Sequence, residues 1–114
     1  MAAVTMQALN KTFSALSDET RRGMVISLMQ GELSAGQLAE PFDMTLTGVM
    51  KHIRVLEEAG LITRTKHGRT VWCRLNPVPL RNASDWMDRY RKFWDARFDD
   101  LARHLQTKRG GGDS

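Results

Sequence analysis

The segment of residues 45–75 constrains the fold more than any other part of this 114-residue chain. Its first half carries an apolar stripe at helical spacing, formed by Leu46, Val49, Met50, Ile53 and Leu56. Gly60 follows where a helix is expected to stop. Two short runs of strand-like composition, 61–66 and 70–75, then flank His67-Gly68-Arg69, which is a hairpin turn signal. The segment therefore predicts a helix followed directly by a β-hairpin.

Three further helices are predicted ahead of this segment. Apolar residues at helical spacing indicate the first over residues 5–16. Ser17 is expected to be the N-cap of the second helix. Ser34 and Gln37 form a capping-box signature for a short third helix. Pro41 cannot continue that helix, so a tight turn is expected before the fourth.

Together these elements predict a mainly α fold with a small β-hairpin. Pro79 suits the first position of a last, long helix, whose apolar stripe continues to Leu105. A short helix, a four-residue turn, a second helix and a basic hairpin occur in this order in a winged helix-turn-helix, whose second helix lies in the DNA major groove. We expect one such domain over residues 1–109 and a disordered tail over 110–114.

The net charge of +4 is confined to the segment 45–75. This segment holds six basic side chains against two acidic ones, whereas the rest of the chain carries eleven of each sign. A concentrated basic patch favours a polyanionic partner, because each phosphate that it neutralises releases counterions. Double-stranded DNA is therefore the expected partner.

Residues suited to DNA contact gather on the predicted helix after Thr45 and on the hairpin. Small side chains would let the helix approach the groove, while lysine and histidine can donate to phosphates or guanine edges. The expected DNA-binding residues are Thr45, Thr47, Gly48, Lys51, His52, Arg54, Arg64, Lys66, His67 and Arg69. Three structural alternatives stay open, namely Thr45 as only an N-cap, Arg54 paired with Glu57 or Glu58, and Arg74 as a solvated strand residue.

The chain resembles the ArsR/SmtB family of bacterial winged-helix transcriptional repressors from about residue 9 through the last helix. The likeness rests on Ser17-Asp18-Glu19-Thr20-Arg21-Arg22, on Lys51-His52 before Val55-Leu56-Glu57, and on Ala59-Gly60-Leu61-Ile62. The resemblance implies a homodimeric repressor that binds a two-fold operator and that an inducer releases. Family members often carry polar side chains where this chain has Leu46 and Met50. This helix is therefore expected to read thymine methyls or to use fewer direct hydrogen bonds.

The last helix carries an apolar seam that is broad for one small core. Its members recur at steps of three and four residues, with Trp86 and Phe93 beside them. In the family that the chain resembles, the first and last helices build the subunit interface. The expected interface residues are Met6, Leu9, Phe13, Met87, Tyr90, Trp94, Phe98 and Leu101. We therefore expect a homodimer, although the same seam can also pack within its own chain.

No cofactor and no metal is expected. Metal-sensing members of the family use a cysteine pair at the third helix, or Asp, His and Glu ligands on the last helix. The matching stretch 32–38 has no cysteine, and Asp100 with His104 would supply only two ligands. Cys73, the single cysteine, excludes an internal disulfide and is expected to be a partly buried structural thiol.

The sequence favours a binding protein over an enzyme. No nucleophile–base pair, phosphate loop or paired carboxylates stand out, and the three histidines fall in different elements. No apolar run reaches the roughly 18 residues of a membrane span and no export signal opens the chain, so a cytoplasmic location is expected.

The expected function is sequence-specific DNA binding, as a homodimeric transcriptional repressor on a two-fold operator. The alternative is a winged-helix module that binds RNA or a protein partner without operator recognition. Positive charge on both the helix and the hairpin favours DNA. The sequence identifies no small-molecule or protein effector.

Overall fold

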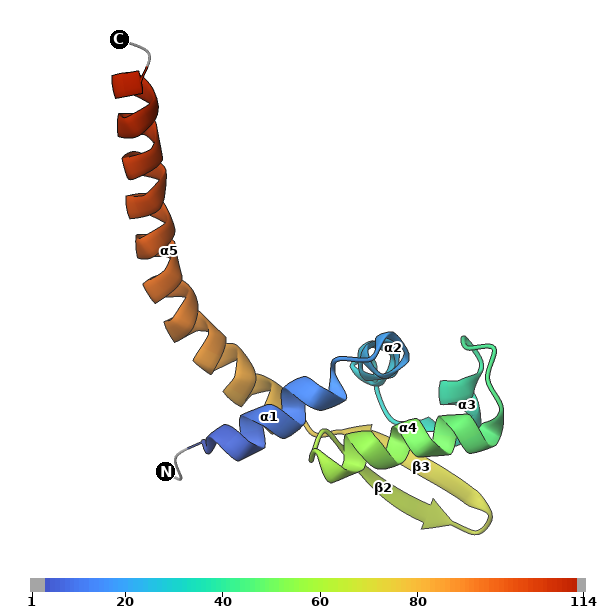
Figure 1. Cartoon of the computed structure of the whole chain (residues 1–114). Helices are drawn as coiled ribbons and strands as arrows, with labels where there is room; N and C mark the ends of the chain where they lie inside the picture. Colours follow the sequence, from blue (N-terminus) through green and yellow to red (C-terminus); the bar gives the residue numbers. More distant parts are fainter. Residues whose placement is uncertain (1–3, 113–114) are drawn as a thin grey trace. The chain divides into compact units, whose positions relative to one another are not determined.

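The computed structural model describes residues 4–112, with side chains for residues 4–107. The chain divides into two compact units, one that ends at Ala83 and one that begins at Ser84. The first described unit holds four helices, a small sheet and the start of the last helix, and the second holds the rest of that helix (Figure 1). The mainly α fold with a β-hairpin is confirmed. The single domain over residues 1–109 stays a prediction.

The helices lie close to their predicted positions. Their bounds are α1 Met6–Ala15, α2 Glu19–Leu28, α3 Ala35–Ala39, α4 Leu46–Glu58 and α5 Val78–Gly112. The capping box of α3 is present, because the Gln37 N–H donates to Ser34 Oγ at 3.1 Å and the Ser34 N–H donates to Gln37 Oε1 at 2.9 Å. α5 continues into the segment 110–114, for which disorder was predicted, and residues 113–114 lie outside the described residues.

The N-cap of α2 is Asp18, and the prediction of Ser17 is wrong by one residue. Asp18 has extended backbone angles, and its carboxylate accepts the N–H of Arg21 at 3.1 Å. The Ser17 hydroxyl instead donates to the Ser14 carbonyl at 2.6 Å, at the end of α1. A carboxylate at this position also suits the positive end of the helix dipole.

The sheet has three antiparallel strands in the order β1-β3-β2. β2 (Ile62–His67) and β3 (Thr70–Leu75) form the predicted hairpin, in which Ile62 lies opposite Leu75 and His67 opposite Thr70. β1 was not predicted. It contains only Leu33 and Ser34, which pair with Cys73 and Trp72 of β3.

One apolar core holds the elements of the first unit together. Its fully buried side chains come from α2, α3, α4, β2 and β3, and the largest are Met24, Leu38, Val49, Ile53, Leu56, Leu61, Ile62 and Cys73. Leu61 links α4 to the hairpin, because its N–H donates to Leu56 and its carbonyl accepts the N–H of Asn76 at 2.8 Å. The shared core and the bonds of Leu61 therefore set the orientation of the hairpin relative to α4.

Candidate nucleic-acid interface

The local sequence of α4 determines which of its faces meets solvent. Thr45 is the N-cap, and its hydroxyl oxygen accepts the N–H of Gly48 at 3.1 Å. The buried stripe of the helix is formed by Val49, Ile53 and Leu56. Because residues three and four apart share a helical face, the opposite side points outward. The exposed side chains on that side are Thr47, Lys51 and Arg54, and Leu46 is exposed at the first turn of the helix.

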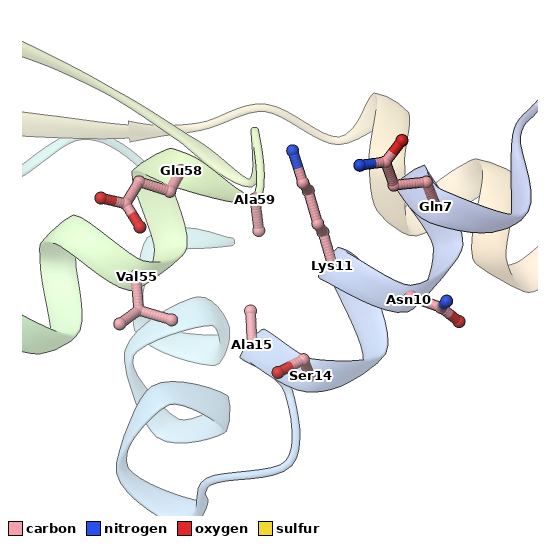
Figure 2. Close-up of a pocket in the computed structure, with 8 residues that line it drawn as sticks. All are labelled: Gln7, Asn10, Lys11, Ser14, Ala15, Val55, Glu58 and Ala59. Atoms are coloured by element: carbon pink, nitrogen blue, oxygen red, sulfur yellow. The ribbon is translucent and has the colours of Figure 1, made fainter.

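The other end of α4 lines a hollow with α1 (Figure 2). Small apolar side chains form part of its wall, and Lys11 extends from α1 toward the end of α4 near Ala59. The complete lining is Gln7, Asn10, Lys11, Ser14, Ala15, Val55, Glu58 and Ala59. None of the predicted DNA-binding residues lines this hollow, so it is separate from the outward face described above.

Gly48 and His52 do not share the outward face with Thr47 and Lys51. Both are half-buried, on the flank of α4 between its core stripe and its exposed side. A Cβ at Gly48 would lie 3.2 Å from the Cε of Met44. The glycine therefore makes room for Met44 in the preceding turn, and Thr47, Gly48, Lys51 and His52 do not form one continuous exposed stripe.

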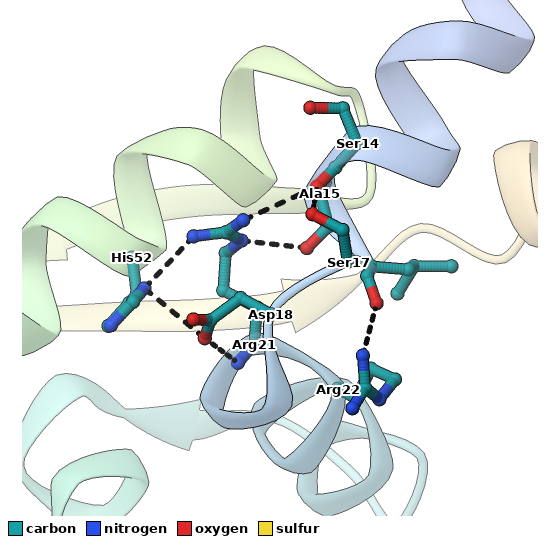
Figure 3. A network of polar contacts seen from close by, with 8 residues as sticks. Ser14, Ala15, Ser17, Asp18, Arg21, Arg22 and His52 are labelled. Atoms are coloured by element: carbon teal, nitrogen blue, oxygen red, sulfur yellow. Dashed lines mark hydrogen bonds and ion pairs between the residues drawn. The ribbon is translucent and has the colours of Figure 1, made fainter.

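His52 faces Arg21, which joins three helices (Figure 3). Arg21 Nε donates to the Ala15 carbonyl at 2.7 Å and Nη2 donates to the Ser14 carbonyl at 3.3 Å. Nη1 lies 3.3 Å from Nδ1 of His52. The guanidinium thus satisfies carbonyls at the C-terminal end of α1, where a cation is also favoured by the helix dipole. Contact between His52 and DNA stays a prediction.

Asp18 belongs to the same network. Its Oδ2 lies 3.9 Å from Nδ1 of His52, in addition to capping α2. The N–H of Arg21 holds the pKa of the Asp18 carboxyl below its ordinary value, and the nearby His52 and Arg21 side chains lower it further against the opposing effect of burial. The folded state therefore favours the ionised form of the Asp18 carboxyl group.

The tip of the hairpin is basic and exposed. Lys66, His67 and Arg69 all meet solvent there. Gly68 has φ of +62°, and no residue other than glycine has positive φ in the described chain. Positive φ at only the first of the two turn residues matches a type II′ turn, which a glycine at that position favours. The turn holds the basic side chains of the tip close together.

Two arginines near the base of the sheet are engaged in ion pairs. Arg64 donates to both carboxylate oxygens of Glu57, at 3.0 and 3.3 Å. Arg74 donates to Glu32 at 3.4 Å, rather than being merely solvated. Arg54 forms none of the ion pairs found among the described residues, so the alternative in which it pairs with Glu57 or Glu58 is not observed. Arg64 is thus a poorer phosphate ligand than the lysine and arginine at the tip.

A second hollow connects the start of α4 with the hairpin. It is lined by Leu46 and Met50 of α4, by Ser34, Ala35 and Gly36, and by Arg69, Thr70 and Val71. Leu46 and Met50 of α4 and Arg69 of the hairpin therefore border one concave surface. This is the arrangement that groove-binding helices with a backbone-contacting hairpin require.

Similar proteins carry the same fold. A family model described as a helix-turn-helix domain matches residues 16–65. The transcriptional repressor SdpR of Bacillus subtilis is 32% identical over 69% of this chain and 88% of its own length. The arsenical resistance operon repressor of Escherichia coli is 31% identical over 90% and 88%. A crystal structure of an ArsR family transcriptional regulator superposes with a TM-score of 0.76 at 36% identity, over 82% of this chain and 97% of that chain.

The chain belongs to the ArsR/SmtB family. Its winged helix-turn-helix consists of α3, α4 and the hairpin, and the predicted family resemblance is confirmed. Membership makes it a DNA-binding transcriptional regulator. None of the described helices combines the length and the apolar content that crossing a bilayer requires.

Cys73 is fully buried in this ArsR/SmtB protein, although partial burial was predicted. Burial raises the pKa of the Cys73 thiol, so at neutral pH the side chain stays protonated and unreactive. Among the described residues no group of three or more His, Cys, Asp and Glu side chains could hold a metal ion. Asp100 pairs with Arg103, three residues further along α5.

The predicted interface residues divide into two groups. Leu9 is buried within its own chain and Phe13 is half-buried, so the expectation that Leu9 forms an interface is corrected. The other six are exposed, namely Met6, Met87, Tyr90, Trp94, Phe98 and Leu101. In the second unit the aromatic rings contact one another along the helix, with Trp86 stacked on Tyr90 at 4.9 Å between centroids. This face is strongly apolar and open.

Proposed function

We propose that this DNA-binding transcriptional repressor acts as a homodimer on a two-fold operator, in the cytoplasm. In each subunit α4 would enter the major groove with its N-terminal turns at the base edges. The basic hairpin tip would contact the adjacent phosphates. The observation that carries the proposal is the concave surface bordered by Leu46 and Met50 at the start of α4 and by Arg69 of the hairpin.

Side-chain chemistry supports a division of roles on this surface. Thr47, Lys51 and Arg54 are exposed on α4 and offer hydrogen bonds to bases or phosphates. Lys66 and Arg69 at the hairpin tip are exposed cations. Phosphate contacts fix the register of the protein on the duplex, and base contacts select the sequence.

The dimer is supported by the apolar face of α5. Single helices of this length in water gain little stability without packing of an apolar face. In the second unit Trp94 and Phe98 form a continuous aromatic surface, with ring centroids 5.7 Å apart. A second copy of the chain offers a matching face, and two-fold symmetry is the commonest way to cover it. Two tethered subunits would bind two half-sites more tightly than one.

The hairpin contact is tested with Arg69→Ala on a duplex that the wild-type protein selects from a random-sequence library. Loss of one phosphate contact should weaken binding to all duplexes and reduce the slope of log affinity against log salt by about one. Fluorescence anisotropy titrations at four or more salt concentrations measure both quantities.

Arg74→Ala is the matched control. It also removes one positive charge from the hairpin, but Arg74 lies near its base and pairs with Glu32. Its salt slope should equal that of the wild type. An Arg69→Ala protein with wild-type affinity and slope would exclude the hairpin tip from the interface.

A further inference from the structure

An exposed leucine stands at the start of α4. Leu46, the first residue of the helix, is 61% exposed. Thr47, the next residue, is also exposed. A single exposed leucine is unremarkable on a protein surface in general. On a helical turn that faces DNA, however, an apolar side chain matches only certain groups at the base edges.

Leu46 is part of a small apolar surface. Met50 lies one turn further along α4 and is half-buried, and both side chains line the hollow that extends to the hairpin. Ala35 and Val71 add apolar wall to the same hollow, while Arg69 stands at its edge. Leu46 and Met50 therefore share a concave surface with the Arg69 cation of the hairpin. If α4 lies in the major groove while Arg69 holds a phosphate beside it, these apolar side chains meet base edges.

Only one group at a base edge in the major groove is apolar. The C5-methyl of thymine projects there, whereas guanine, adenine and cytosine present donors and acceptors. An apolar side chain against one of those polar edges would leave a donor or acceptor unpaired, which costs binding free energy. Against a thymine methyl it removes apolar surface from water instead.

From this placement we infer that Leu46, supported by Met50, is a specificity-determining residue that reads thymine through its methyl group. The inference rests on the proposed function, because it names the base that the same α4 surface selects. The operator half-site therefore contains at least one thymine whose methyl group contacts Leu46, in addition to any bases read by Thr47, Lys51 or Arg54.

The test replaces each thymine of the selected duplex, one at a time, by deoxyuridine, which lacks only the methyl group. At the thymine read by Leu46, affinity should fall about fourfold, equivalent to about 0.8 kcal/mol for one buried methyl. With Leu46→Ala the same replacement should change affinity less than 1.5-fold, roughly a quarter of a kcal/mol. The salt slope of this variant should stay that of the wild type, because no phosphate contact is lost.

Val55→Ala is the control, since Val55 is an exposed apolar residue of α4 that lines the other hollow. It should keep the full sensitivity to deoxyuridine. If the library yields no enriched sequence, sequence-specific binding and the thymine inference both fail. If a sequence is enriched but every deoxyuridine replacement is neutral, or if Leu46→Ala keeps the wild-type sensitivity, the proposed function stands and the role of Leu46 is overturned.

Discussion

At the scale of single residues, the Asp18 carboxylate acts on two elements at once. It caps α2 through the N–H of Arg21 and lies 3.9 Å from the ring of His52 on α4. Its pKa lies below the ordinary value of 3.8, chiefly because of the bond from the Arg21 N–H. A carboxyl group whose pKa is lowered in the folded state adds stability above its unfolded pKa, and this stability is lost as the pH falls through the folded pKa.

We therefore predict that Asp18→Ala is less stable than the wild type at pH 7 by about 1 kcal/mol, the usual cost of losing an N-cap. The difference should begin to narrow as the pH falls below about 3.8, the ordinary pKa of the carboxyl, and should narrow further as the pH falls through the lower pKa of the folded state. Urea unfolding followed by circular dichroism, at pH 7 and pH 3 and at one protein concentration, measures both differences.

Asp18→Asn serves as the control, because an asparagine can cap the helix without titrating. It should recover most of the stability that Asp18→Ala loses at pH 7. A difference between wild type and Asp18→Ala that is as large at pH 3 as at pH 7 would show that the ionised carboxylate is not the favoured form.

Residue composition alone predicted the basic surface but not which cations are available to DNA. Arg64 and Lys66 are two residues apart on β2, so their side chains lie on the same face of the strand, and they carry the same charge. Arg64 lies two residues nearer the base of the hairpin, where Glu57 of α4 holds it, whereas Lys66 extends beyond that carboxylate. The difference depends on how α4 packs against the hairpin, which no local pattern in the sequence encodes.

At the scale of elements, the end of α4 determines where the hairpin begins. The N–H of Gly60 donates to the Glu57 carbonyl and the N–H of Leu61 donates to the Leu56 carbonyl, both at 2.9 Å. These two bonds form a Schellman motif, and the fully buried Leu56 and Leu61 provide its apolar contact. Gly60 has φ of +76°, which a glycine adopts without the strain that a side chain would cause.

Gly60→Ala is accordingly predicted to lower the free energy of unfolding by about 1–2 kcal/mol, the cost of placing an L side chain in this backbone conformation. A clash is not the cause, because the nearest heavy atom to the added Cβ would be the Cγ of Pro79 at 3.7 Å. Thermal and urea unfolding measure the loss.

Gly36→Ala is the matched substitution. Gly36 lies inside α3 with ordinary helical φ, and an added Cβ would meet only Ser34 Oγ at 3.9 Å. Alanine should be neutral there or stabilising by up to about 1 kcal/mol. Equal losses of unfolding free energy in Gly60→Ala and Gly36→Ala would mean that the positive φ of Gly60 does not cause the loss.

The starts of the helices were predicted to within one or two residues because capping signals are local. Ser34, Thr45 and Gly60 each perform the capping role that the sequence indicates. β1 could not be predicted, since two residues carry no periodicity and its strand partner β3 lies some forty residues away. The α2 N-cap was misplaced because Ser17 and Asp18 are both good caps, and only the bond to Ser14 separates them.

At the scale of the whole molecule, the aromatic face of the second unit supports the proposed dimer. Tyr90, Trp94 and Phe98 are all exposed in the single chain, and their rings contact one another along the helix. An open apolar surface of this kind on a soluble chain indicates an interaction site. The sequence predicted the seam, because a regular helical repeat needs no tertiary information.

Trp94→Asp is predicted to convert the wild-type dimer into monomers, because an unpaired charge would have to be buried at the centre of the apolar face. Affinity for the selected operator should fall at least tenfold, since two half-sites would no longer be bound by tethered subunits. Lys92→Asp places the same acidic side chain on an exposed position of α5 outside the aromatic face, and it should leave the dimer intact. Sedimentation velocity at micromolar concentration distinguishes the two forms, and circular dichroism verifies that each variant retains its helices. A wild-type protein that sediments as a monomer under these conditions would contradict the dimer directly, and a Trp94→Asp protein that remains dimeric would move the interface away from this face.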